Sequence, residues 1–190
     1  MSRRHEPVAD RLFFAIFPNQ YACARIAQVA DRLRIEHGLQ GKLLPTSRLH
    51  VTLFFLGDYA GLPPEIVARA SEAAAAVALP RFNVAFDRAK TFSGKRRSLP
   101  LVMLGSDGVA ALKRLQRDLG TALDVVGLGN QWNADYTPHV TLLYDSRSVA
   151  DRVVEVVDWP VEEFVLVHSQ LGRSKYVPLA RWPLLSQSES

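Results

Sequence analysis

The stretch RLHVTLFFLG, Arg48–Gly57, decides how the rest of the chain is interpreted. It has the apolar character of a buried strand, yet it carries a histidine and a threonine two residues apart. Side chains alternate between the two faces of a strand, so Val51 and Leu53 point one way and His50 and Thr52 the other. We therefore expect this strand to bury one face and to present an imidazole and a hydroxyl on the opposite face.

The letters HVTL return in TPHVTLLYD, Thr137–Asp145. A four-letter repeat by itself is weak evidence, because such repeats also arise by chance. Here each copy holds one of only five histidines in the chain, follows a proline (Pro45 or Pro138) within a few residues, and is followed by an aspartate. The two copies are therefore interpreted as two halves of one site rather than as packing accidents.

Around the motifs, the hydrophobic spacing and the turn residues predict alternating strands and helices. Strands are predicted at Arg11–Pro18, Leu49–Leu56, Arg81–Phe92, Leu99–Leu104, His139–Leu143, Phe164–His168 and Tyr176–Trp182. Helices are predicted at Gln20–His37, from Pro63 to about Leu79, at Gly108–Val126 and, as a short one, at Val149–Val156. This order is typical of an α+β fold with a mostly antiparallel sheet, and the repeated motif suggests two related lobes.

Composition narrows the classes of function. The chain has 190 residues, a net charge of +4 and a pI near 9.5, which suit an anionic partner such as RNA but are equally common without one. Cys23 is the single cysteine, which excludes an intrachain disulfide and a cysteine metal cluster. The chain has no signal-peptide pattern and no apolar run of membrane length, so we expect a cytoplasmic protein without membrane association.

Two imidazoles and two hydroxyls in one cleft match the needs of a phosphodiester reaction. One imidazole takes a proton from the attacking oxygen and the other gives a proton to the leaving oxygen, while hydroxyls stabilise the non-bridging oxygens. Two histidines without a third ligand do not make a usual zinc site, and there is no G-x-S-x-G motif, so neither a metal nor another cofactor is predicted. The alternative for each histidine alone is a structural bond to a backbone carbonyl.

The chain resembles the two-histidine phosphoesterases, and among them the RNA 2′,3′-cyclic phosphodiesterases, also called 2′-5′ RNA ligases. The resemblance rests on four stretches in order: RLFFAI from Arg11, LHVTLFFLG, PHVTLLYD, and GRSKYVPLARWPL from Gly172. It implies a bilobal α+β fold, with two mostly antiparallel sheets flanked by helices and a central cleft. Residues 1–190 would then be one bilobal domain, and we expect residues 1–10 to be a flexible N-terminus.

The resemblance also implies an activity, which is hydrolysis of a terminal 2′,3′-cyclic phosphate to a 2′-phosphomonoester, with 2′-5′ ligation at the same site. His50 would be the proton donor, His139 the proton acceptor, and Thr52 and Thr141 would hold the phosphate. The partners would be RNA ends or nucleotides that bear the cyclic phosphate, and we expect a monomer. The alternatives are a non-catalytic RNA- or nucleotide-binding module of the same fold and an enzyme for another small cyclic phosphate.

One position departs from the family pattern. Many members have an arginine after the double leucine of the second motif, where this chain has Tyr144. A tyrosine donates a hydrogen bond but is uncharged at neutral pH, so substrate affinity or preference is expected to differ. Tyr176, Arg173 and Lys175 on the closing strand are candidates to compensate. Tyr176 is equally well interpreted as a half-buried strand aromatic.

The basic stretch KTFSGKRRS has two interpretations. Lys95, Arg96 and Arg97 are suited to guide a phosphate backbone, and Phe92 is suited to stack on a base. Alternatively, the stretch is a solvated hairpin turn with Phe92 in the core. Trp132, in the glycine-flanked loop before the second motif, is a further candidate for stacking.

Overall fold

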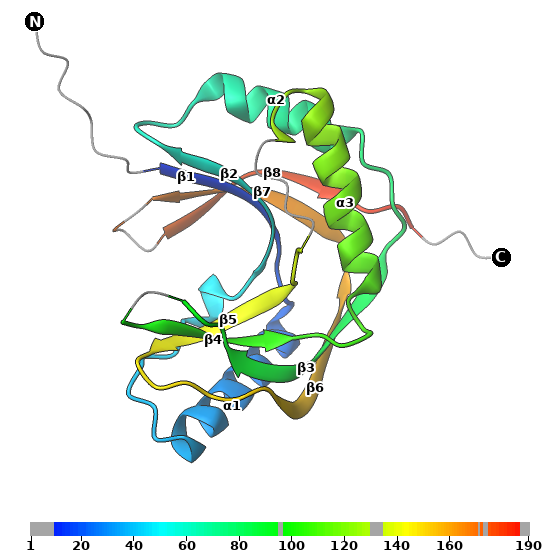
Figure 1. Cartoon of the computed structure of the whole chain (residues 1–190). Helices are drawn as coiled ribbons and strands as arrows, with labels where there is room; N and C mark the ends of the chain where they lie inside the picture. The colour runs from blue at the N-terminus through cyan, green and yellow to red at the C-terminus, as the bar shows by residue number, and fades with distance from the viewer. Residues whose placement is uncertain (1–9, 95–96, 130–134, 171, 173–174, 187–190) are drawn as a thin grey trace, which may run out of the picture.

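The computed structural model describes residues 10–94, 97–129, 135–170, 172 and 175–186 (Figure 1). These residues form three α-helices, α1 (Gln20–Glu36), α2 (Pro64–Ala75) and α3 (Ala110–Val125), and a 3₁₀ turn, η1 (Thr46–Arg48). They also form eight strands: β1 (Asp10–Ile16), β2 (Val51–Tyr59), β3 (Phe82–Thr91), β4 (Leu99–Leu104), β5 (His139–Asp145), β6 (Arg152–Val161), β7 (Glu163–Gln170) and β8 (Lys175–Pro183). The α+β class predicted from the sequence is confirmed.

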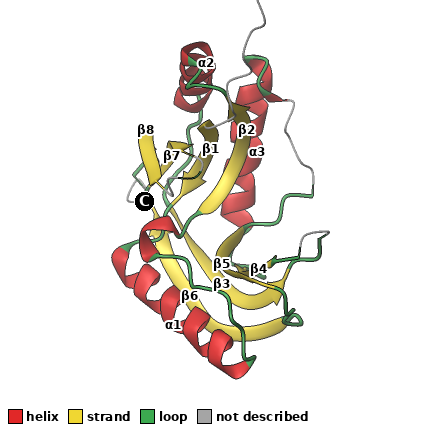
Figure 2. Cartoon of the chain, turned by 90° about the vertical axis from the view of Figure 1, so that its left-hand side faces the viewer, coloured by secondary structure: helices red, strands yellow, loops and turns green. Residues whose placement is uncertain are grey.

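The strands form one eight-stranded antiparallel sheet in the order β6-β3-β4-β5-β2-β1-β7-β8, so the prediction of two sheets was wrong. The sheet consists of two four-stranded halves, and the strand that carries each HVTL motif lies at the inner end of its half. The halves are joined where β2 and β5 pair through Val51 and Val140. The sequence pattern identifies strands but does not show which strands pair with each other. The short pairing of β2 with β5 links the two halves into a single sheet. Figure 2 shows the strong bend of the sheet between its two halves.

The predicted short helix at Val149–Val156 is also wrong, because most of this segment belongs to strand β6. Its valines are β-branched and therefore favour a strand, and β6 pairs with β3 along most of its length. Alternate residues at its end, Val157, Trp159 and Val161, are buried. Trp159 stacks on Phe86 of β3 with ring centroids 5.1 Å apart, which packs β6 against β3. Strand β6 is the edge strand of its half.

The three helices share one hydrophobic core with the strand residues that face them, and this leaves the other face of the sheet for a site. Leu12, Phe14 and Ile16 of β1 belong to this core, whereas Phe13 and Ala15 face the opposite way. Helix α1 follows β1 but packs against β5 and β6, while α2 and α3 pack together against β8, β2 and β3 (Figure 1). Within the described residues, no helix combines the length and the apolar character that crossing a membrane requires.

Candidate active site

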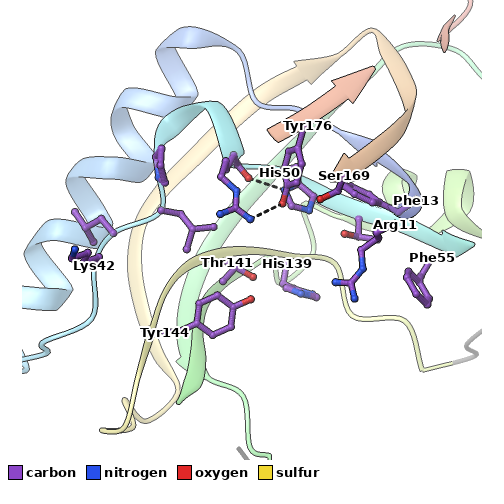
Figure 3. A pocket seen from close by; sticks show the side chains of 15 residues that line it. Arg11, Phe13, Lys42, His50, Phe55, His139, Thr141, Tyr144, Ser169 and Tyr176 are labelled. Atoms are coloured by element: carbon purple, nitrogen blue, oxygen red, sulfur yellow. Dashed lines mark hydrogen bonds between the residues drawn. The ribbon is translucent and has the colours of Figure 1, made fainter. Parts of the chain in front are cut away.

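A cavity of about 590 Å³ lies on the helix-free face where the two halves of the sheet meet. The residues that line it come from β1, β2, β5, β7, β8, the segment that ends in η1, and the link between η1 and β2 that carries His50. They are Arg11, Phe13, Lys42, Leu43, Leu44, Pro45, Arg48, His50, Thr52, Phe55, His139, Thr141, Tyr144, Ser169 and Tyr176. Figure 3 shows His50 and Tyr176 on one wall, and His139, Thr141 and Tyr144 on the other. The histidine and the threonine of both motifs therefore reach one cavity.

Both motif strands contain a β-bulge at the same letter of HVTL. The ladder to the neighbouring strand skips Leu53 in β2 and Leu142 in β5. A bulge inserts one extra residue and shifts the alternation that follows it. As a result, the next side chains to reach the cavity are Phe55 and Tyr144, five positions after their respective histidines, and both are exposed. The repeat is therefore a structural repeat that extends beyond its four identical letters.

The two histidines are held by the same kind of hydrogen bond, from Nδ1 to the backbone carbonyl two residues earlier. Nδ1 of His50 lies 2.8 Å from the carbonyl oxygen of Arg48, and Nδ1 of His139 lies 2.8 Å from that of Thr137. A carbonyl oxygen only accepts hydrogen bonds, so each Nδ1 carries the proton. In the neutral imidazole, Nε2 is then the unprotonated nitrogen. Each histidine can accept a proton at Nε2 when neutral and donate one from Nε2 when charged.

Burial lowers the pKa of both histidines, because the charged imidazolium is poorly solvated in the cavity wall. The nearby charges of His139 and Arg48 lower the pKa of His50 further, while the bond to the Arg48 carbonyl acts in the opposite direction. A charge on His139 therefore affects the protonation of His50. A bound phosphate would raise both pKa values, because its negative charge favours the imidazolium.

Aromatic rings fix the position of each imidazole. Phe13 and Tyr176 lie with ring centroids 5.2 Å from that of His50, and the Tyr176 ring meets the imidazole edge-on. Phe92 packs in the same edge-on manner against His139, at 5.0 Å. Phe92 is therefore a support behind His139, and it is not among the described residues that line the cavity.

Two further contacts position the site and were not predicted from the sequence. The half-buried hydroxyl of Tyr136 donates to the carbonyl oxygen of Thr52 at 2.8 Å. This bond connects the segment just before the second motif with the backbone of the first motif. Asp145 is buried, and its Oδ2 accepts the backbone N–H groups of Gln40 and Gly41 at 2.6 and 2.7 Å. These bonds fix the backbone just before residues 42–45, which line the cavity.

Some predicted site residues fall outside what the structure describes. Arg173 is one of these, and so are Trp132 and two members of the basic stretch, Lys95 and Arg96. Arg97 is exposed. Their predicted roles remain predictions.

Arg11, Lys42, Arg48 and Ser169 line the cavity but were not among the predicted site residues. Arg11 had a signal, because it lies two positions before Phe13 in the strand β1 and therefore shares a face with it. Lys42 and Arg48 lie outside the strands and had none, since their positions depend on how the segment before β2 packs. Within the described residues, no three His, Cys, Asp or Glu side chains gather as a metal site would require.

The fold and the paired His-x-Thr motifs define the class of the two-histidine phosphoesterases. Residues 22–173 match the family model of the 2′-5′ RNA ligase superfamily, and the chain belongs to this superfamily. It is 28% identical over 173 residues to the RNA 2′,3′-cyclic phosphodiesterase of Thermus thermophilus, an alignment that covers 85% of this chain and 82% of that protein.

Solved structures show the same relationship. TT0787 of Thermus thermophilus has a similar fold, with a TM-score of 0.74, 23% identity, and coverage of 94% of this chain and 100% of that one. LigT of E. coli in complex with 3′-AMP gives a TM-score of 0.71 at 29% identity, with 93% and 98% of the two chains covered. E. coli LigT has also been solved with phosphate, and this structure gives a TM-score of 0.64 at 27% identity, with 94% and 99% covered.

Proposed function

We propose that this protein is an RNA 2′,3′-cyclic phosphodiesterase that releases a 2′-phosphomonoester by paired-histidine acid–base catalysis without a metal ion. The observation that carries the proposal is the matched pair of imidazoles. His50 and His139 come from different halves of the sheet, line one cavity, and each have Nδ1 bound to a carbonyl, which leaves Nε2 for proton transfer. The cyclic phosphodiesterase relative and the 3′-AMP complex of LigT support this choice of substrate.

In the proposed reaction, His139 accepts a proton from water as the water oxygen forms a bond to phosphorus. The bond from phosphorus to the 3′-oxygen breaks, and His50 donates its proton to that oxygen. The products are a 2′-phosphomonoester and a free 3′-hydroxyl, and solvent returns the two histidines to their starting protonation states. A 5′-hydroxyl that attacks in place of water would give a 2′-5′ bond, which is the ligase reaction of the superfamily name.

The hydroxyls of Thr52 and Thr141 are proposed to donate to the non-bridging phosphate oxygens. Both side chains line the cavity, one from each motif strand. Charge builds up on these oxygens in the transition state, so preorganised donors stabilise the transition state more than the ground state. The hydroxyls of Tyr144 and Tyr176 also line the cavity and add two donors without charge.

The deciding experiment follows the product. The purified protein is incubated with adenosine 2′,3′-cyclic phosphate, and with a short RNA that ends in the same group, in the presence of EDTA. Phosphorus NMR then shows which oxygen keeps the phosphate. The proposal expects the 2′-phosphomonoester. Release of the 3′-phosphomonoester would contradict it, and tight binding without any product would favour the non-catalytic binding module.

A further inference from the structure

Three cationic side chains line the cavity, Arg11, Lys42 and Arg48, and the described lining includes no carboxylate. Arg11 is already neutralised, because Asp58 accepts two of its N–H groups at 2.7 and 2.8 Å. Lys42 is exposed. Arg48 is half-buried and forms no ion pair with any carboxylate in the described part of the chain. Its charge therefore remains available for an anion.

The guanidinium of Arg48 is held in place by Tyr176. Its Cζ lies 5.2 Å from the centre of the Tyr176 ring, and Nη2 approaches the Tyr176 hydroxyl at 3.4 Å. Nε of Arg48 is buried and has no hydrogen-bond partner among the described residues. Because protein atoms enclose Nε, an anion in the cavity would meet the outer Nη groups of this guanidinium. A guanidinium with an unpartnered N–H and no carboxylate partner is incompletely compensated, and a bound anion would supply the missing charge.

The backbone of Arg48 serves the same site. Its carbonyl oxygen accepts the Nδ1–H of His50, and the Tyr176 ring that supports its side chain also meets His50 edge-on. A phosphate within reach of Nε2 of His50 therefore lies on the wall that the guanidinium lines. Arginine suits this role because its planar fork of donors can bind two phosphate oxygens at once.

We propose that Arg48 is a phosphate-binding residue of the cavity, contacting the non-bridging oxygens of the substrate beside His50. The inference rests on the proposed function only in taking the ligand to be a phosphate ester. Arg48 supplies a permanent positive charge to the cavity, whereas Thr141 and Tyr144 supply uncharged hydroxyls.

The first test measures binding by titration calorimetry with inorganic phosphate and with adenosine 2′-monophosphate. Arg48→Met keeps most of the packing on Tyr176 and removes the charge, and we expect about 10- to 100-fold weaker binding of both ligands. Arg48→Lys keeps the charge without the fork and should lie between. Arg114→Met, which removes an exposed arginine of α3 outside the cavity, is the matched control and should bind as the wild type does.

The second test measures kcat/KM against pH with the cyclic phosphate. The titratable and charged groups that face His50 are Arg48 from its own segment, His139 from β5 and Tyr176 from β8. Removing the Arg48 charge should lower kcat/KM about 10- to 100-fold and move the pH profile toward higher pH, because the imidazolium of His50 becomes easier to form. The shift reports the Arg48 charge beside His50 in the free protein. A fall in kcat/KM at an unchanged melting temperature, together with the weaker phosphate binding of the first test, separates a phosphate contact from a purely structural arginine.

The outcomes separate this inference from the proposed function. A wild type that hydrolyses the substrate, with an Arg48→Met variant of unchanged affinity and rate, would overturn the inference alone. A wild type that binds phosphate through Arg48 but releases no product would overturn the proposed function and support the inference. If Arg48→Met does not fold, Arg48→Lys takes its place in both measurements. Wild-type affinity and rate in Arg48→Lys would count against a bidentate contact between the guanidinium and the phosphate.

Discussion

Val51 and Val140 lie opposite each other as an antiparallel pair, and this pair joins the two halves of the sheet. Both side chains are fully buried. Each valine is the second letter of its HVTL copy, so the two motifs run in opposite directions about the pair in an approximately twofold relation. This relation brings one imidazole and one hydroxyl from each motif to the same cavity.

Alanine at either motif histidine should abolish most of the activity. His50→Ala and His139→Ala should each lower kcat for the cyclic phosphate by about 10²- to 10⁴-fold, since each removes one proton transfer. The double variant should lose little more than the worse single variant, because both groups act in one step. His37→Ala, outside the cavity, is the control and should keep the wild-type rate. Near-normal turnover in both single variants would refute the assigned roles.

The pH dependence should differ between kcat/KM and kcat. Burial lowers the pKa of both histidines in the free protein, so the profile of kcat/KM should centre below the ordinary histidine value of about 6.5. The anionic substrate favours the imidazolium and raises both pKa values, so the profile of kcat should lie at higher pH. Initial rates at constant ionic strength give both curves as macroscopic values of the pair. Coincident curves would argue against an anion bound between the histidines.

Valine at either motif threonine should slow the reaction without unfolding the protein. Thr52→Val and Thr141→Val keep the shape and the backbone but remove one hydroxyl that is proposed to donate to the phosphate. We expect kcat/KM to fall about 10- to 10³-fold in each variant, with little change in melting temperature. Thr121→Val, on α3 and outside the cavity, is the control. A normal rate in both motif variants would show that the hydroxyls do not bind the phosphate.

Asp145 is expected to stabilise the fold in a pH-dependent way. Backbone N–H groups of Arg147, Gly41 and Gln40 hold the pKa of its carboxyl below the ordinary value. A carboxylate with a lowered pKa contributes stability above its unfolded pKa and loses this contribution as the pH falls through the folded one. Asp145→Asn should therefore lower the free energy of unfolding at pH 7 by about 1–3 kcal/mol.

Urea unfolding of wild type and Asp145→Asn between about pH 3 and pH 7 measures this contribution, and the difference between the two proteins should shrink as the pH falls. The exposed carboxylate of Asp158 on β6 is the control, and Asp158→Asn should change stability little at any pH. A difference between wild type and Asp145→Asn that is constant over the whole range would contradict the assigned role of the carboxylate.

Local chemistry was enough to locate most of the elements and the centre of the site. Helix α1 was predicted from apolar spacing, with Gly38 as its stop, and it spans Gln20–Glu36. The two-residue period of a strand put His50 with Thr52 and His139 with Thr141, and these four side chains do line the cavity. Both signals are local in the chain, where the geometry of one element decides which side chains share a face.

Contacts between distant segments decided the rest. Because β2 pairs with β5, the structure has one sheet where two were expected. Because Arg152–Val161 pairs with β3, this segment is the strand β6, where a short helix was expected. The bulges at Leu53 and Leu142 turned Phe55 and Tyr144 toward the cavity, and packing of the segment before β2 brought Arg48 to Tyr176. Hydrogen bonds between strands and packing between segments depend on the whole fold. The sequence therefore determines which side chains of each motif share a face of the strand, but only the tertiary structure decides which other residues join them in the cavity.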